Sequence, residues 1–243
     1  MRNDFVHVYP TKEALIEAAA HRVTSVLASS LAKNPLAFIA VSGGSTPEPL
    51  YERLAAASDL DWRHLHVCFV DERNVGPEDS DSNYRMVNQA WLSHVPIPKQ
   101  KIHRMRGELA ASQAADEYEQ ELRRLPIPSA NGLPRFHFML LGMGPDGHTA
   151  SLFPGTAGLA EKKRWVIGNH VAKMNTDRIT LTYPVINNAA SLMFLIAGAD
   201  KADPLASVLS EESPLPAAGI EPTQGELVWM VDQAAAAKLP RES

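Results

Sequence analysis

The segment "FHFMLLGMGPDGHTASLFPGT", residues 136–156, joins a short apolar run to a glycine-rich loop. Gly142, Gly144 and Gly147 have the G-x-G-x-x-G spacing of a dinucleotide-binding fingerprint. That fingerprint requires a long helix from the third glycine and an acidic residue about 20 positions later, at the end of the next strand. Pro154 follows Gly147 too soon for such a helix, and the next apolar run, "WVIGNH", ends without an acid. The sequence therefore argues against a nicotinamide enzyme.

Outside this segment, short apolar runs rich in β-branched residues alternate with helical patterns. The runs predict strands at 5–9, 36–41, 65–70, 136–141, 192–197 and 227–231, with weaker candidates at 101–105, 165–168 and 178–182. Helices are predicted at 11–32, 47–56, 83–92, 110–125, 184–190 and 201–209. This alternation is typical of an α/β fold with a doubly wound, mostly parallel sheet and helices on both faces. We expect residues 1–243 to form a single domain, with room for a small subdomain.

Two proline- and glycine-containing segments interrupt the alternation. Residues 125–136, "LPIPSANGLPRF", are expected to be a loop, and residues 210–226, "SEESPLPAAGIEPTQGE", a second and mobile one. Neither has the composition of a linker between domains.

The composition narrows the function classes. The 243 residues are 45% hydrophobic and 21% charged, as in an ordinary globular protein, and the net charge of -5 argues against a nucleic-acid partner. Cys68 is the single cysteine and lies in an apolar run, so we expect a buried structural thiol and no intramolecular disulfide. The amino terminus has no apolar signal core, and the longest apolar stretch, 192–199, is too short to span a bilayer. We therefore expect a cytoplasmic protein without a membrane partner.

In doubly wound folds, ligands bind beyond the carboxyl ends of the strands. The segment "SGGSTPEPLYERL" follows the strand predicted at 36–41 and can be either a plain turn into the next helix or a cradle for an anion. Thr46 is suited to cap that helix and Pro47 to begin it. No lysine follows at Walker spacing, which argues against a nucleoside triphosphate. The residues that would form the cradle are Ser42, Gly43, Gly44 and Ser45.

Three charged residues, Asp71, Glu72 and Arg73, follow the strand predicted at 65–70. They could form a solvated corner, but in a parallel sheet they would lie beside the Ser-Gly turn. There Arg73 could bind a phosphate with two parallel hydrogen bonds. Ser82 and Asn83 are expected to cap the helix that follows.

The opening segment then places Asp146 and His148 in a glycine-rich loop at a strand end. Glycines allow positive φ and close backbone approach, and exposed amide groups of Gly142, Gly144 and Gly147 could stabilise an oxyanion. A histidine in such a loop is suited to general-base chemistry, although it could equally make a structural hydrogen bond. The sequence has no G-x-S-x-G or H-E-x-x-H motif, and His64 and His66 have no third ligand nearby, so no metal is expected.

Four segments together resemble the 6-phosphogluconolactonase family: "VSGGSTPEPLYERL", "VCFVDERNVGPEDSDSNYRM", "LLGMGPDGHTASLFPGT" and "RITLTYPVINNAASLMFLIAGADKADPL". The resemblance extends from about residue 5 to 231. It implies the fold of glucosamine-6-phosphate deaminases and ribose-5-phosphate isomerases. It also implies hydrolysis of 6-phosphogluconolactone, in the oxidative pentose phosphate pathway, without cofactor or metal.

The resemblance also implies roles for individual residues. His148 matches the general base that activates water, and Asp146 is the acid of the same loop. Ser42 to Ser45 match the phosphate loop, Arg73 the arginine that holds the phosphate, and Arg178 and Lys201 further basic positions of the site. Asp71 and Glu72 resemble the acidic pair of the deaminases, so a deaminase-like sugar-phosphate isomerase stays an alternative, as does a non-catalytic sugar-phosphate sensor.

One position favours the lactonase over the deaminase. The deaminases resemble "DGHIAFNEP" at this loop, with a glutamate five positions after the histidine. Here that position holds Phe153, which cannot relay a proton and is expected to form an apolar wall of the pocket.

Overall fold

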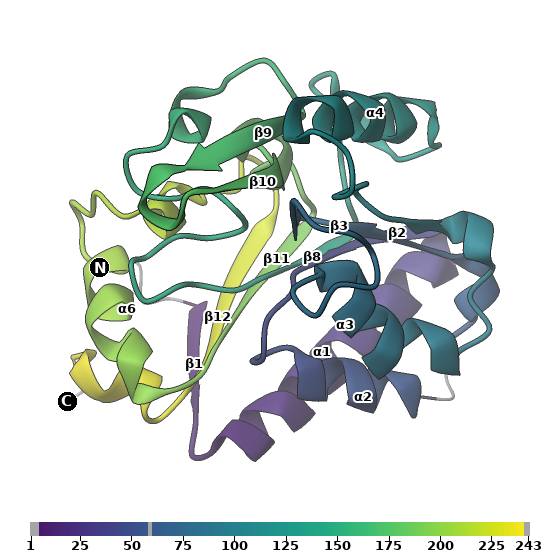
Figure 1. Cartoon of the computed structure of the whole chain (residues 1–243). Coiled ribbons are helices and arrows are strands. Elements are labelled where there is room, and N and C mark those ends of the chain that lie inside the picture. The colour runs from purple at the N-terminus through teal and green to yellow at the C-terminus, as the bar shows by residue number, and fades with distance from the viewer. Residues whose placement is uncertain (1–4, 58–59, 241–243) are drawn as a thin grey trace.

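The structure is a computed structural model that describes residues 5–57 and 60–240. A seven-stranded sheet with the order β1-β12-β11-β8-β2-β3-β5 runs through the molecule, and every neighbouring pair is parallel (Figure 1). Its strands are β1 (Val6–Tyr9), β2 (Ala37–Val41), β3 (Leu65–Phe69), β5 (Ile102–His103), β8 (Phe138–Leu141), β11 (Ser191–Ile196) and β12 (Glu226–Asp232). Six of them correspond to the apolar runs predicted as strands, and β5 to the weaker candidate at 101–105.

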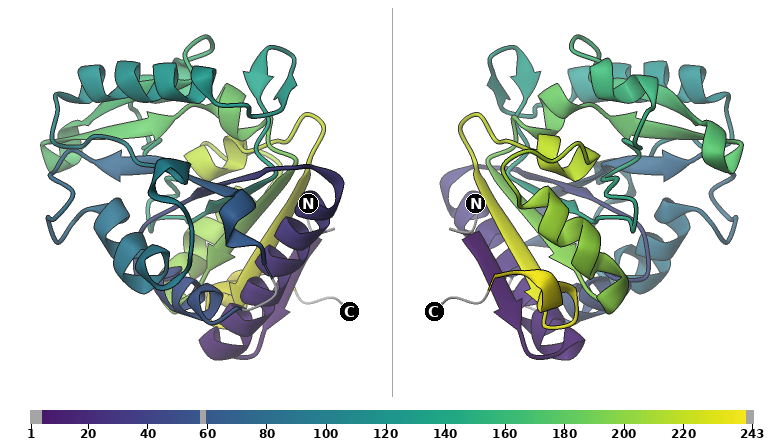
Figure 2. Two further views of the ribbon diagram at one scale, coloured as in Figure 1. Left: turned by 90° about the vertical axis from the view of Figure 1, so that its right-hand side faces the viewer. Right: turned by 90° about the vertical axis from the view of Figure 1, so that its left-hand side faces the viewer.

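Helices cover both faces of this sheet, which confirms the doubly wound α/β fold. One face packs against α1 (Lys12–Lys33), α2 (Glu48–Ala55) and α3 (Asn83–Ala90), and the other against α4 (Ala111–Arg124), α5 (Tyr183–Ile186) and α6 (Ala202–Val208). Successive side chains of a strand point to opposite faces, so Ile39 belongs to the first core and Phe38 to the second. The turned views show α4 and α1 on opposite sides of the molecule (Figure 2).

A second, antiparallel sheet lies on the side of α4. It consists of β4 (Asp71–Arg73), β10 (Thr176–Leu181) and β9 (Val166–Val171). The weak strands predicted at 165–168 and 178–182 are therefore not members of the parallel sheet. Only four residues join β9 to β10, and parallel strands need a crossover of a dozen or more. The chain from β3 passes through Val70 into β4, so the three charged residues form a strand rather than a solvated corner.

The segment 125–136 contains a small hairpin that we did not predict. Its strands β6 (Ser129–Ala130) and β7 (Leu133–Pro134) are joined by Asn131 and Gly132, both with positive φ, of 55° and 74°. Asn-Gly is the preferred pair for a two-residue hairpin turn, so the signal was present in the sequence.

Two helix boundaries differ from the prediction. Helix α2 begins at Glu48 and has no side-chain cap, so neither the predicted cap at Thr46 nor the predicted start at Pro47 is correct. Helix α5 ends at Ile186 instead of 190, and just beyond it the side chain of Asn188 donates to three carbonyls of the β6–β7 segment. The predicted caps of α1 at Thr11 and of α3 at Ser82 are confirmed.

The segment 210–226 packs against the rest of the protein. Ala217 and Ile220 are buried, and the Ala217 N–H donates to the carbonyl of Gly147. The prediction of a mobile surface loop was therefore wrong for the centre of this segment. Among the helices of residues 5–57 and 60–240, none is long and apolar enough to cross a membrane.

Candidate active site

The candidate site lies between β2 and β8, where the winding of the sheet reverses. From β2 the chain continues to β3 and β5 on one side, and from β8 to β11 and β12 on the other. Loops leaving two such adjacent strands diverge to opposite faces and leave a crevice at the carboxyl ends. A cavity of about 280 Å³ is found there. Its walls include most of the predicted site residues: Ser42, Gly43, Gly44, Ser45, Asp71, Arg73, Gly142, Gly144, His148, Arg178 and Lys201.

His148 forms a hydrogen-bonded pair with Asp146, which supports it from outside the cavity. The distance from His148 Nδ1 to Asp146 Oδ1 is 2.5 Å, and the same oxygen accepts the His148 backbone N–H at 3.2 Å. Partial burial alone would raise the pKa of Asp146, but the hydrogen bonds from His148 outweigh it and lower this pKa. An ionised Asp146 holds the Nδ1 proton in place, so the Nε2 lone pair is left to accept a proton.

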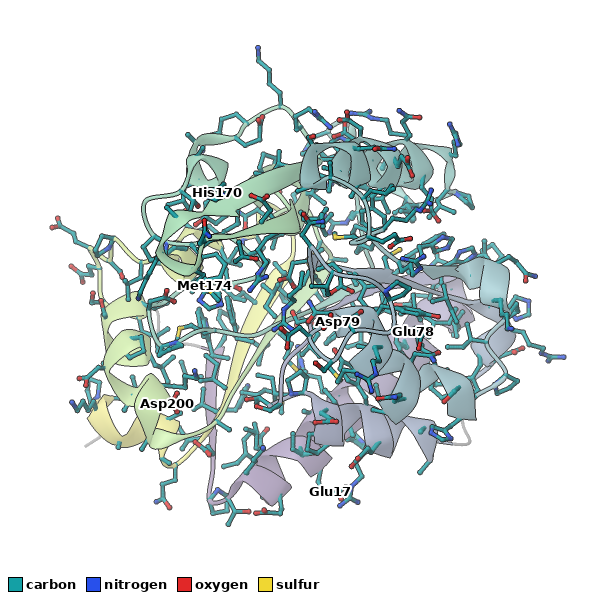
Figure 3. All side chains as sticks on the ribbon, viewed as in Figure 1. Glu17, Glu78, Asp79, His170, Met174 and Asp200 are labelled. Carbon is teal, nitrogen blue, oxygen red and sulfur yellow. The ribbon has the colours of Figure 1, made fainter. Side chains whose placement is uncertain are left out.

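Phe153 lines the cavity and stacks on the imidazole of His148, with ring centroids 4.0 Å apart. Its place as an apolar wall was predicted, and the stacking adds a second restraint on the ring of His148. Met174, at the turn between β9 and β10, also lines the cavity and was not predicted; His170 lies elsewhere on the same hairpin (Figure 3).

Two of the three glycines in the loop after β8 use their amide groups within the loop. The Gly144 N–H donates to the His148 carbonyl and the Gly147 N–H to the Gly144 carbonyl, at 2.9 and 3.0 Å. These two amides are occupied, which corrects the expectation that they could bind an oxyanion. A Cβ on Gly144 would lie 2.1 Å from the His148 ring, and Gly147 has a φ of +75°. A Cβ on Gly147 would also meet Leu215, so the segment 210–226 supports this loop, which no sequence signal suggested.

The Ser-Gly turn after β2 forms the facing wall. The Ser42 hydroxyl donates to the Leu140 carbonyl at 2.7 Å, and the Ser42 carbonyl accepts the Tyr51 hydroxyl at 2.5 Å. The Ser42 hydroxyl is therefore engaged within the fold, and the place of residue 42 in a phosphate loop stays a prediction. Gly44, with a φ of +102°, and Ser45 continue the turn along the cavity.

Strand β4 carries two buried carboxylates, of which only Asp71 enters the site. Asp71 lines the cavity and accepts the Ser151 hydroxyl at 2.6 Å, a contact that the sequence did not suggest. Glu72 turns away from the cavity and accepts the backbone N–H groups of Asn83 and Tyr84 at the start of α3. Burial raises the pKa of Glu72, against the opposing effect of these hydrogen bonds.

Three cations border the cavity. Arg73 and Arg178 are direct partners across the β4–β10 pair, and like charges placed opposite each other on a sheet repel. Burial, and next the charge of Arg73, lower the pKa of Arg178. Lys201 precedes α6 and makes an ion pair with Asp200 at 3.0 Å. Such a cluster is stabilised when an anion binds between its members.

The remaining sequence candidates lie away from this cavity. Cys68 is buried in the core, as predicted. His66 makes a hydrogen bond to His103, and within residues 5–57 and 60–240 no group of three or more His, Cys, Asp or Glu residues is arranged to hold a metal ion.

Comparison with known proteins agrees with this geometry. Residues 10–229 match the model of the family described as glucosamine-6-phosphate isomerases/6-phosphogluconolactonase. The chain belongs to this family. A 6-phosphogluconolactonase of Synechocystis is 43% identical over 239 residues, covering 96% of this chain and 98% of that protein. A chloroplastic 6-phosphogluconolactonase of Arabidopsis thaliana is 37% identical over 244 residues, covering 96% of this chain and 75% of that protein.

Solved structures are similar over almost the whole chain. The 6-phosphogluconolactonase from Trypanosoma brucei has a TM-score of 0.86 at 28% identity and covers 97% of this chain and 98% of its own. A monomeric glucosamine-6-phosphate deaminase has a TM-score of 0.78 at 21% identity, covers 96% of this chain and 99% of its own, and shares the fold. The predicted fold relationship to the deaminases is confirmed.

Proposed function

We propose that this protein is a carboxylic ester hydrolase that converts 6-phospho-D-glucono-1,5-lactone to 6-phospho-D-gluconate, in the oxidative pentose phosphate pathway. The observation that carries the proposal is one cavity that combines the Asp146–His148 pair with three cations. The full-length similarity to proteins named 6-phosphogluconolactonase supports the same activity. We also retain the cytoplasm as the expected location.

In the proposed reaction, His148 accepts a proton from water at Nε2 while the water oxygen bonds to the lactone carbonyl carbon. The tetrahedral intermediate collapses by breaking the bond between this carbon and the ring oxygen. The imidazolium then returns the proton to the leaving ring oxygen, and the product is an open-chain acid. A lactone carbonyl is already electrophilic, so positioning and proton transfer are the main tasks of the protein.

The phosphate end is assigned to the Ser-Gly turn and the cations. The backbone of Gly43, Gly44 and Ser45 and the side chain of Arg73 border one part of the cavity, with Arg178 opposite Arg73. The Gly144 and Gly147 amides are occupied, so of the three loop glycines we retain Gly142, which borders the cavity, for the oxyanion, together with the positive potential of the cavity. Binding energy at the phosphate orients the reacting carbon.

A deaminase activity has two features against it. Phe153 stands where the deaminase resemblance has its glutamate, and it stacks on the catalytic candidate His148. Asp71 is held by the Ser151 hydroxyl, which suits a fixed acceptor for a sugar hydroxyl better than a mobile base.

The test is to supply 6-phosphogluconolactone and follow acid release above spontaneous hydrolysis, with glucosamine 6-phosphate tested in parallel for ammonia release. We expect rapid lactone hydrolysis and no ammonia above background. Ammonia release at a comparable rate would replace the lactonase assignment by the deaminase. Tight binding of 6-phosphogluconate without turnover of either substrate would favour a sugar-phosphate sensor.

A further inference from the structure

The two halves of the proposed phosphate site come from different strands, and one side chain lies between them. Asn83, the first residue of α3, is 2% exposed and also borders the cavity. Its Nδ2 donates to the Asp71 carbonyl at 2.9 Å and lies 3.4 Å from an Asp71 carboxylate oxygen. Its Oδ1 is buried without a hydrogen-bond donor in the described part of the chain.

The other side of the Asn83 carboxamide contacts the Ser-Gly turn. A Cβ built on Gly43 would lie 1.7 Å from Asn83 Oδ1 and 2.2 Å from Cγ. The Gly43 backbone therefore lies directly against the Asn83 carboxamide. Gly43 does not have a positive φ, so residue 43 must be glycine because of space and not because of conformation.

Gly44 has the opposite requirement. Its φ is +102°, a conformation that L side chains rarely adopt, but a Cβ there would meet no atom within 4 Å. Glycine is thus required at positions 43 and 44 for two independent reasons, space at 43 and backbone conformation at 44. A substitution at one position can therefore serve as a control for a substitution at the other.

Asn83 is itself held by the strand that carries Asp71. Its backbone N–H donates to Glu72 Oε1 at 2.7 Å, and the Tyr84 N–H donates to Glu72 Oε2 at 2.8 Å. The start of α3 is therefore fixed to β4. Because the Asn83 side chain contacts Gly43, the position of α3 also determines where the turn after β2 can lie.

We infer that Asn83 is a positioning residue that sets the separation between the Ser-Gly turn and the Asp71–Arg73 strand, and hence the width of the phosphate site. The inference rests on the proposed function. It explains the glycine at position 43 by the close contact with Asn83. It also predicts that the effects of substitutions at residues 43 and 83 depend on each other. A change at one position alters the tolerance of the other.

The experiment is a double-mutant cycle with Gly43→Ala and Asn83→Ala, in which KM, kcat and Tm are measured for the full chain. Gly43→Ala should raise the KM for 6-phosphogluconolactone about 10- to 100-fold and lower the Tm, since a displaced turn misplaces the phosphate. Asn83→Ala alone should raise KM by a smaller factor and leave kcat closer to wild type, because His148 lies on a separate loop.

The decisive variant is the double substitution. Removing the amide leaves only the Asn83 Cβ, 3.0 Å from the new methyl group, so shifts of a few tenths of an ångström suffice. The double variant should therefore regain most of the KM and Tm lost in Gly43→Ala. Asn83→Gly, which removes the Cβ as well, is a second route to the same rescue.

Gly44→Ala combined with Asn83→Ala is the matched control and should show no rescue, because its strain is conformational. Asn83→Asp is nearly isosteric but puts an acceptor beside the Asp71 carbonyl, so we expect a lower Tm than for Asn83→Ala. A double variant no better than Gly43→Ala in both Tm and KM would overturn the inference, as would equal rescue of Gly44→Ala.

The Tm values of the ligand-free proteins and their binding of 6-phosphogluconate by calorimetry separate this inference from the proposed function. If the wild type failed to hydrolyse the lactone, the function would be wrong. Rescue of Tm and 6-phosphogluconate binding in the double variant would still establish the coupling, and its absence would still refute it.

Discussion

At the scale of single residues, the proposal depends most on His148. His148→Ala should lower kcat by about 10²–10⁴-fold, because the proton acceptor for water is lost. KM should change little, since the cations that would hold the phosphate lie on other elements. The measurement is steady-state hydrolysis of 6-phosphogluconolactone corrected for the spontaneous reaction.

A matched control for this variant is available in the same protein. His170 also makes a hydrogen bond to an aspartate, from Nδ1 to Asp177 Oδ1 at 2.8 Å, but it is exposed on β9 and does not line the cavity. His170→Ala should retain wild-type kcat. Equal losses in the two variants, or more than a third of the activity left in His148→Ala, would exclude His148 as the base.

Gly144 provides a second prediction at this scale. A Cβ on Gly144 would lie 2.1 Å from two atoms of the His148 ring, so Gly144→Ala must displace the imidazole. We expect kcat to fall by about 100-fold, as is typical for a misplaced catalytic group. Gly76→Ala, at a glycine without positive φ and with no atom within 4 Å of its Cβ, should leave kcat unchanged. A Gly144→Ala enzyme with wild-type kcat would show that the ring position is unimportant.

Residue types in the sequence indicated which positions line the candidate site. They did not indicate which hydroxyl and amide groups at those positions are available to a ligand. The eleven predicted residues named above and Phe153 do line one cavity, because they lie in loops after the parallel strands, before α6, or on strands β4 and β10 of the second sheet. The engagement of the Ser42 hydroxyl with Leu140, and of the Gly144 amide with His148, depends on the exact path of the backbone. A sequence does not specify that path to the ångström that a hydrogen bond requires.

At the scale of elements, the β4–β10 pair links function to stability. Arg178→Gln removes one of two like charges that face each other, and the ligand-free Tm should stay equal to wild type or rise. The same variant should raise the KM for the phosphorylated lactone about 10- to 100-fold, the loss expected for one charge-assisted hydrogen bond. Thermal unfolding with and without 6-phosphogluconate, together with kinetics, tests both effects.

Arg123→Gln is the appropriate comparison. Arg123 lies on α4, pairs with Glu119 and stacks on Trp165, outside the cavity. Its loss should lower the Tm and leave KM unchanged. If Arg178→Gln behaved in the same way, Arg178 would be a structural residue and not part of the phosphate site.

Elements that were predicted well are those with long apolar periodicity. The central strands β2, β3, β8 and β11 correspond to apolar runs because every residue in them is buried. Helix α1 was located within one residue at each end. The β6–β7 hairpin was missed because its strands have two residues each and bury little. The β9–β10 hairpin was misplaced because its six-residue strands are only partly buried, and the turn that joins them sets their pairing. Residues 71–73 carry three charges and still form a strand, because β10 pairs with their backbone and each side chain has a partner. Asp71 accepts from Ser151, Glu72 accepts from the Asn83 N–H, and Arg73 donates to the Asp81 carbonyl.

At the scale of the whole molecule, the candidate active site and the histidine that we expect to control acid stability lie at opposite ends of the parallel sheet. The candidate site lies at the carboxyl ends of the parallel strands. His66 lies near the start of β3, where its Nδ1 is 2.9 Å from His103 Nε2, and His103 Nδ1 is 2.6 Å from Glu121 Oε1. This chain of hydrogen bonds links β3 to the edge strand β5, and β5 to helix α4.

Burial, and next the positive charges of His103 and Lys101, lower the pKa of His66 to about 4, below the 6.5 of a free histidine. The unfolded chain therefore binds a proton at a pH where the folded protein does not. The stability that this group contributes is complete above about pH 6.5 and is lost as the pH falls from there towards 4.

Wild-type Tm should therefore decrease more steeply between pH 7 and pH 5 than the Tm of His66→Gln, which keeps a donor for His103 but does not titrate. Each kcal/mol of this difference corresponds to about 2–4 °C in a chain of this size. Differential scanning calorimetry at three pH values measures it, and His21→Gln, at an exposed position on α1, is the control that should follow the wild-type curve. Lactone hydrolysis at pH 7 should be the same in all three proteins, because His66 is remote from the cavity. Parallel Tm curves for wild type and His66→Gln would mean that His66 does not contribute to the acid sensitivity of the fold.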